Sequence, residues 1–261
     1  MADGRRCVFC ELRPADSGEH LTPDWLRQAL PRERKTLLSR GSHGREVVQE
    51  VTPFDVREHC VCTPCNNHWM STIDNRVKPH LLPLVLGEGR ELDPDAQLTL
   101  ATWAFKTCLV YQQTSKDLTN PYDVMPREHY RFLYQQRKHP RPPGRMQTWL
   151  LGYLGKRYRL GSFYSAEFTN DGSLPTGTKA YQATLVVGCA VIHVFATYGY
   201  DENLAPLDLT RWGDWSQVML PMWPVTGGVS YPASHALDDT GLVNFVRSWS
   251  GGKLNPAKIG L

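Results

Sequence analysis

Apolar residues recur at the spacing of a helix in four parts of the chain. Together they predict helices over residues 65–78, 93–114, 126–138 and 237–249. The second helix has the strongest pattern, because Pro94 stands in its first turn, where proline is well tolerated, and a long apolar stripe follows. We expect the helices over residues 65–78 and 93–114 each to turn an apolar face toward a core.

β-Branched and aromatic residues dominate much of the second half of the chain and predict strands there. These strands cover residues 146–154, 159–168, 179–187, 190–198 and 217–220. The uncharged run from Ala180 to Tyr200 has the length of a membrane span, but polar residues interrupt it. Two strands that meet near Gly188 explain the run better than a spanning helix, so no membrane segment is expected. Two further strands are predicted nearer the N-terminus, over residues 35–40 and 45–51.

A linker is predicted between Pro79 and Leu92, where two prolines and two glycines fall close together. It divides the chain into two predicted domains, residues 1–89 and residues 90–261. The second is expected to be an α+β domain with a mainly antiparallel sheet, since its strands follow one another with helices before and after them.

The composition is that of a folded protein. The chain has 261 residues, 41% hydrophobic and 21% charged, enough for one large core or a small domain attached to a medium one. Fibrous, collagen-like and wholly disordered classes are excluded. The formal net charge of +3 is too small to indicate a nucleic-acid partner by itself. The first residues lack the apolar stretch of a secretory signal, so a soluble, cytoplasmic protein is expected.

The cysteines predict a metal site near the N-terminus. Five of the seven lie in the first 65 residues, which favours metal binding in a reducing compartment over a disulfide framework. Four of them form two pairs of equal spacing, Cys7-x-x-Cys10 and Cys62-x-x-Cys65. A tight turn presents both sulfurs of such a pair, and two turns complete a tetrahedral zinc site. Cys60 or His59 would also suit a metal, but zinc needs four ligands and we prefer the two matched pairs.

The second pair leads directly into the first predicted helix. The order of a cysteine knuckle, a hairpin, a second knuckle and a helix is typical of a treble-clef zinc finger. A structural zinc ion would stabilise a segment that is too small to hold itself together by its own core. The N-terminal domain is therefore expected to be a treble-clef zinc finger.

Polar residues beside the two cysteine pairs carry a further signal. Glu19 and His20 follow the first pair, Pro23 comes three residues later, and Asn66 directly follows the second pair. The segment thus resembles the HNH endonuclease family, whose pattern is Cys-x-x-Cys, an acid-His dipeptide commonly followed by proline, then Cys-x-x-Cys with a His or Asn after it. The resemblance covers roughly residues 7–80 and implies a finger of the ββα-metal type.

The resemblance implies hydrolysis of a phosphodiester bond assisted by one hard cation, Mg²⁺ or Mn²⁺. It makes His20 the general base, a role that suits an imidazole with a pKa of about 6.5. It also makes Glu19 a ligand of the cation, and Asn66 a residue that helps to hold it. The family usually has an Asn shortly before the second cysteine pair, and residues 54–59 contain none. A finger that keeps its cysteines but has lost the chemistry is therefore the alternative.

A basic stretch lies between Pro126 and Leu160, with nine Lys or Arg and a single acidic residue. Six aromatic residues interleave with these cations. Cations neutralise phosphates and aromatic rings stack on bases, so the stretch is a candidate nucleic-acid surface. Its proline-rich loop, residues 138–145, is expected to be exposed. The predicted substrate contacts are Arg137, Lys138, Arg141 and Arg145.

Two functions follow from these patterns. The first is a metal-dependent HNH-type endonuclease, a phosphodiester hydrolase acting on DNA or RNA, with structural Zn²⁺ and catalytic Mg²⁺ or Mn²⁺ as cofactors. A homodimer would suit a double-strand cut by such a one-metal site. The alternative is a catalytically inactive zinc-finger module that binds nucleic acid or another protein. Cation-dependent cleavage separates the two.

Overall fold

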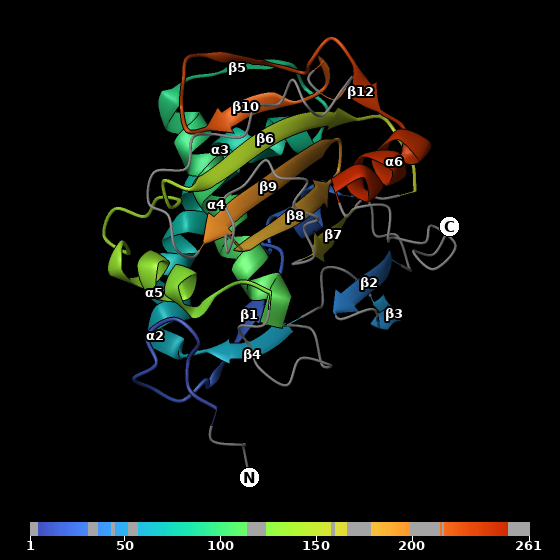
Figure 1. Ribbon diagram of the computed structural model, residues 1–261. Coiled ribbons are helices and arrows are strands. Elements are labelled where there is room, and N and C mark those ends of the chain that lie inside the picture. Colours follow the sequence, from blue (N-terminus) through green and yellow to red (C-terminus); the bar gives the residue numbers. More distant parts are fainter. Residues whose placement is uncertain are drawn as a thin grey trace.

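The computed structural model describes residues 5–30, 36–42, 45–51, 57–113, 124–157, 160–165, 179–198, 215 and 217–249. These residues form a mixed α and β structure, shown in Figure 1. Its helical segments are α1 (Leu26–Ala29), α2 (Thr63–Cys65), the π-helical η2 (Asn66–Met70), α3 (Ser71–Val85), α4 (Pro94–Gln113), α5 (Arg127–Gln135) and α6 (Asp239–Trp249).

The largest sheet is antiparallel along its whole main path, with the strand order β10-β6-β9-β8-β7, and β12 pairs with β6 in parallel. Its strands are β6 (Met146–Tyr153), β7 (Leu160–Ser165), β8 (Lys179–Val187), β9 (Ala190–Tyr198), β10 (Leu220–Trp223) and β12 (Ala236–Leu237). The expected mainly antiparallel sheet is therefore confirmed.

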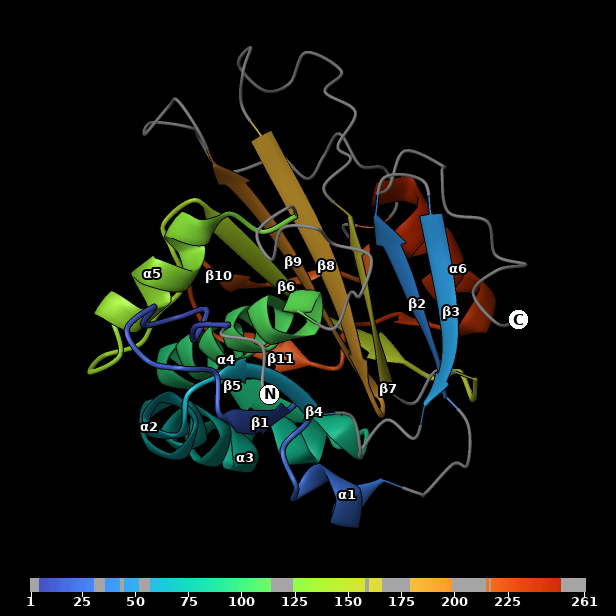
Figure 2. The ribbon, with the colours of Figure 1, turned by 90° about the horizontal axis from the view of Figure 1, so that it is seen from below.

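Helices cover both faces of this sheet, and nearly every residue of β8 and β9 is buried as a result. Alternate side chains of a strand point to opposite faces. Ile192 and Val194 of β9 pack in the core that contains α4, whereas Val191 and Phe195 pack in a second core with α6. Figure 2 shows α4 and α6 on opposite sides of the strands of this sheet.

Helix α4 is buried almost all round, and its bounds agree with the prediction from the sequence. It packs along α3 and beneath the large sheet. Although α4 is 20 residues long, neither it nor another helix among the described residues combines the length and apolar character needed to cross a membrane.

Short strand pairs complete the fold. Two of them join distant parts of the chain: β1 (Ser17–His20) pairs with β4 (Arg57–Val61), and β5 (Arg90–Leu92) pairs with β11 (Val229–Tyr231). The third pair is the hairpin of β2 (Thr36–Ser42) and β3 (Arg45–Val51). All three pairs are antiparallel.

Helix α3 continues seven residues beyond the predicted end at Lys78 and contains Pro79 and Pro83. A proline inside a helix costs about 3 kcal/mol, because it removes a hydrogen bond and crowds the preceding turn. Leu81 and Leu84 are fully buried in the continued helix, and burying each gains roughly 1.5–3 kcal/mol. The apolar stripe thus offsets the prolines, and much of the predicted linker is helical.

Core residues from both sides of residue 89 form one cluster, which runs from Cys7 to Tyr231. The division of the chain into domains of residues 1–89 and 90–261 remains a prediction. The last predicted strand, residues 217–220, lies three residues further on as β10. Because β10 is the edge strand of the sheet, it accommodates Pro221, which has no N–H to donate.

The turn between β8 and β9 fixes the sheet to the end of α3. Gly188 has a φ of +59°, and the N–H of the next residue, Cys189, donates to the carbonyl of Val85 at 3.0 Å. A Cβ atom at residue 188 would lie 2.4 Å from that carbonyl oxygen. Only glycine combines this backbone conformation with so close an approach.

We expect Gly188→Ala to lower the free energy of unfolding by more than about 1 kcal/mol, because it adds both backbone strain and a steric clash. The measurement is urea denaturation followed by circular dichroism. Gly144→Ala is the matched control, since a Cβ atom there would meet nothing within 4 Å. Equal stability of the two variants would contradict the proposed contact between the turn and α3.

Candidate metal centre and its surroundings

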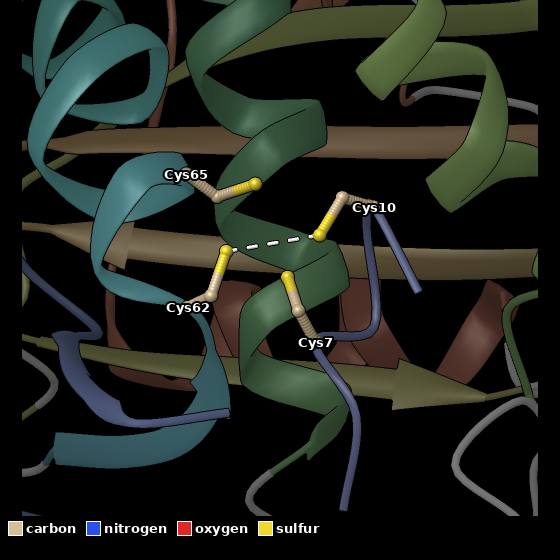
Figure 3. Close-up of side chains that lie close together, drawn as sticks. All are labelled: Cys7, Cys10, Cys62 and Cys65. Atoms are coloured by element: carbon tan, nitrogen blue, oxygen red, sulfur yellow. Dashed lines mark hydrogen bonds between the residues drawn. The ribbon is translucent and has the colours of Figure 1, made fainter. Parts of the chain in front are cut away.

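Four cysteine sulfurs converge near the N-terminus, as Figure 3 shows. The sulfurs of Cys7, Cys10, Cys62 and Cys65 all lie within 4.8 Å of one another, and those of Cys10 and Cys62 are 3.7 Å apart. A disulfide would need about 2.05 Å. A tetrahedral zinc ion with Zn–S bonds of about 2.3 Å separates its sulfurs by about 3.8 Å. The spacing therefore fits a metal ion such as zinc.

Backbone hydrogen bonds shape both turns that present these sulfurs. In the first, the N–H of Glu11 donates to the carbonyl of Cys7 at 2.9 Å, and the N–H of Val8 donates to the carbonyl of Cys60 in β4. In the second, the Asp16 carboxylate accepts from the N–H of Thr63 at 2.7 Å, where the helical segment begins. Both cysteine pairs are thus fixed by the fold and not only by a metal.

The thiols of this group differ in pKa, because each meets a different balance of hydrogen bonding and burial. A hydrogen bond from Cys65 lowers the pKa of Cys7 to about 5, whereas burial raises the pKa of Cys62 to about 11. Four crowded sulfurs do not all ionise without a positive charge among them. A divalent cation supplies that charge and stabilises the thiolates as ligands.

Cys60 lies outside this group, in agreement with the prediction that the two matched pairs belong together. Its side chain is fully buried, and burial raises the pKa of its thiol well above the ordinary value. It is a neutral core residue of β4. His59 is not part of the four-cysteine group either.

The first cysteine turn is attached to α5. The Glu11 carboxylate accepts hydrogen bonds from Arg127 at 2.6 Å and from Arg131 at 3.0 Å. Phe9 packs against Tyr130, with ring centroids 5.3 Å apart. Two of the nine cations in the basic stretch therefore hold the first cysteine turn against α5, and hydrogen bonding by Arg127 lowers the pKa of Glu11 to about 2.

Glu19 belongs to a buried ion cluster. Its carboxylate accepts from the Lys106 ammonium at 3.1 Å, and the same ammonium donates to both oxygens of Asp74 at 2.9 Å. Asp74 also accepts from the indole N–H of Trp103 at 3.0 Å. Burial alone lowers the pKa of Lys106, but the two carboxylates outweigh it and hold the pKa above its ordinary value. The ammonium therefore stays charged and joins β1, α3 and α4.

The other two residues of the predicted catalytic site have partners of their own. His20 follows Glu19 on β1, so the two side chains leave the strand on opposite faces. His20 Nε2 lies 3.7 Å from the carboxylate of Asp24, and Asn66 donates to the hydroxyl of Ser17 at 2.8 Å. Each of the three predicted catalytic residues therefore contacts a different partner. The catalytic roles of Glu19, His20 and Asn66 remain predictions.

The described residues do not bring a second group of three or more His, Cys, Asp or Glu side chains together as closely as the four cysteines. The Glu19 carboxylate accepts from Lys106, and its role as a ligand of a catalytic cation stays a prediction. Asp74 of α3 belongs to the same ion cluster through Lys106.

The predicted substrate contacts gather at the loop between α5 and β6. Arg137, Lys138 and Arg141 are exposed, and Arg145 is half-buried. The guanidinium of Arg137 lies over the ring of Tyr134, 4.4 Å from its centroid. Of the remaining cations in the stretch, Arg159 lies outside the described residues.

Sequence reasoning missed two cations that the structure makes prominent. Lys106 is the sole basic residue within the largely neutral α4, a signal that a buried ion pair was present. Arg76 of α3 lines a cavity together with Arg141, 65 positions later in the chain. Helical spacing gives no sign of that second juxtaposition.

Comparisons with known proteins show no similarity from which a function could be taken. No protein-family model matches the chain, and neither a curated protein nor a solved structure matches it.

We expect the purified protein to hold one zinc ion per chain, measured by inductively coupled plasma mass spectrometry. Cys62→Ala should lose the ion and melt at a lower temperature, because a ligand is removed. Cys60→Ala is the matched control and should keep the ion, since Cys60 lies outside the group. Equal loss of zinc in the two variants would contradict this ligand set.

We expect Lys106→Met to lower the free energy of unfolding by about 3–5 kcal/mol, because it leaves the buried Glu19 carboxylate unpaired. Adding Glu19→Gln should recover part of the loss. Chemical denaturation of the single and double variants gives the coupling energy, which should exceed about 1 kcal/mol. Lys78→Met on the surface of α3 is the control. Strict additivity of the two substitutions would show that the pair is not coupled.

Proposed function

We propose that this chain is a nucleic-acid-binding protein whose four-cysteine centre holds a structural zinc ion. The observation that carries the proposal is the loop between α5 and β6, residues 136–145, which we call the basic loop. It exposes Arg137, Lys138 and Arg141. No acidic residue occurs from His129 through Arg145. A run of cations without nearby carboxylates attracts phosphates and makes binding dependent on salt.

The contacts of the finger suggest how the metal centre serves this surface. The first cysteine turn contacts α5 through Glu11 and Phe9, and the basic loop follows that helix directly. A metal ion that fixes the turn would therefore also fix the start of the loop. Arg137 on the ring of Tyr134 presents a flat cationic face of the kind on which bases stack.

The proposed binding function needs no catalytic cation. Glu19, the residue that would hold Mg²⁺ or Mn²⁺ by resemblance to the HNH family, has its carboxylate bound to Lys106 inside the core. A divalent ion at Glu19 would be repelled by the adjacent ammonium of Lys106, which a second carboxylate, Asp74, also holds in place. The geometry thus favours a finger that serves structure and binding.

Phosphodiester hydrolysis with His20 as the base is the second candidate. The observation in its favour is local: His20 ends β1, which pairs with β4 just before the helical segment that begins at Thr63, and its Nε2 lies 3.7 Å from Asp24. This order of two strands and a helix supports the ββα-metal likeness. The Asp24 carboxylate would orient the His20 imidazole, and the imidazole would accept a proton from water.

We expect binding of DNA or RNA that weakens steeply as salt rises, measured by fluorescence anisotropy on single- and double-stranded oligonucleotides. Replacing Arg137, Lys138 and Arg141 by Gln should reduce the slope of log K against log salt by about 0.7–0.9 for each phosphate that the variant no longer neutralises. Lys156→Gln, beyond the other end of β6, is the control. Binding that does not depend on salt, or a triple variant that binds like the wild type, would contradict the proposal.

The same samples separate the two candidates. Each oligonucleotide is incubated with the wild type and with His20→Ala, with and without added Mg²⁺ or Mn²⁺, after zinc content is matched. Intact oligonucleotide in all samples is the result expected for a binding protein. Cleavage by the wild type that His20→Ala abolishes would establish the hydrolase and its base instead.

A further inference from the structure

A cavity of about 240 Å³ lies between α3, α4 and the basic loop. Helix α3 contributes Arg76, and the loop contributes His139 and Arg141. Two hydroxyl side chains, Thr99 and Thr102, line the side formed by α4. Residues from three separate parts of the chain thus surround one small space.

The loop wall of this cavity is anchored to α4. The hydroxyl of Thr102 donates to the carbonyl of Leu98 at 2.7 Å and also lies 3.4 Å from the carbonyl of Pro140. Pro140 stands between the two polar loop residues of the cavity, so this contact positions both of them. The cavity belongs to the folded structure and does not depend on an exposed loop alone.

Two of the residues that line the cavity, Arg76 and Arg141, are cationic. In the part of the chain that the structure describes, no carboxylate pairs with Arg76 or Arg141. Asp74, two residues before Arg76 on α3, gives its carboxylate to Lys106 and Trp103. A guanidinium stays charged throughout the pH range of proteins, so two positive charges share this space. An anion between them would relieve their repulsion.

The remaining lining residues are apolar, namely Ile73, Leu98 and Pro140. The volume lies below the range of about 300–1,000 Å³ that is typical for whole drug-sized ligands. It suits one phosphate group with part of an attached sugar. The planar guanidinium matches phosphate oxygens through paired hydrogen bonds, and the apolar wall suits the carbon skeleton of the sugar.

We propose that this cavity binds the phosphomonoester at the end of a nucleic-acid strand, with Arg76 and Arg141 on the phosphate oxygens. The inference rests on the proposed nucleic-acid binding and names the part of the ligand that the cavity takes. A terminal phosphate carries more negative charge than an internal phosphodiester, and it protrudes from the strand. Two guanidiniums at the rim of one small cavity therefore favour a strand end over the middle of a strand.

The test compares three forms of one internally labelled oligonucleotide: with a 5′-phosphate, with a 3′-phosphate, and with hydroxyl groups at both ends. The 261-residue chain should bind one phosphorylated form about tenfold more tightly than the hydroxyl form, the effect of one charge-assisted contact. Arg76→Gln should abolish this preference, so that the variant binds the phosphorylated and hydroxyl forms with equal affinity. Lys78→Gln, an exposed cation of the same helix outside the cavity, should keep the preference.

The outcomes distinguish this inference from the proposed function. Salt-dependent binding without preference for a terminal phosphate would overturn the inference and leave the proposed function standing. If no strand binds, the proposed function fails, and calorimetry with adenosine monophosphate and with inorganic phosphate tests the cavity by itself. Binding of the mononucleotide that Arg76→Gln abolishes would then support a phosphomonoester site for a free nucleotide. Binding of neither probe would overturn the inference.

Discussion

The ammonium of Lys106 lies between the carboxylates of Glu19 and Asp74, and the arrangement of β1, α3 and α4 depends on that contact. A buried charge is stable only when opposite charges and hydrogen bonds replace the water it has lost. Here two carboxylates do so, and the indole N–H of Trp103 satisfies a further lone pair. The strand that carries Glu19 is therefore tied to the central helix. The same contact gives the acid of the HNH-like dipeptide a partner inside the protein, so one interaction bears on both the fold and the proposed function.

A second set of contacts connects the four-cysteine group to the surface of the protein. A hydrogen bond from the N–H of Val8 to the carbonyl of Cys60 joins the first cysteine turn to β4, and Glu11 and Phe9 join that turn to α5. The basic loop begins where α5 ends, and its residue Arg141 meets Arg76 of α3 across a cavity. In this arrangement a metal ion would act at a distance, by fixing the helix from which the cationic loop starts. The four-cysteine group and the predicted substrate contacts, which the sequence presents as separate features, are joined through α5.

The sequence predicts α4, α5, α6 and the long strands β6, β8 and β9 well, because each has a periodic pattern of its own. Short polar strands such as β1 and β5 carry no such pattern, and their partners β4 and β11 lie far along the chain. For the candidate site the contrast is the same. Equal spacing within two motifs is enough to select the cysteine ligands, whereas the partner of Glu19 lies 87 positions away and no local signal connects the two. A family likeness assigns roles to residues, but it cannot show that another side chain already occupies one of them.

The most direct test of this account is a crystal structure of the protein soaked in Mn²⁺, with anomalous scattering measured at the zinc and manganese edges. The account expects a zinc peak among the sulfurs of Cys7, Cys10, Cys62 and Cys65, no manganese peak at Glu19, and the Lys106 ammonium within hydrogen-bonding distance of the Glu19 carboxylate. A manganese ion bound to Glu19, with Lys106 displaced, would contradict it and restore the one-metal hydrolase as the better interpretation of this fold.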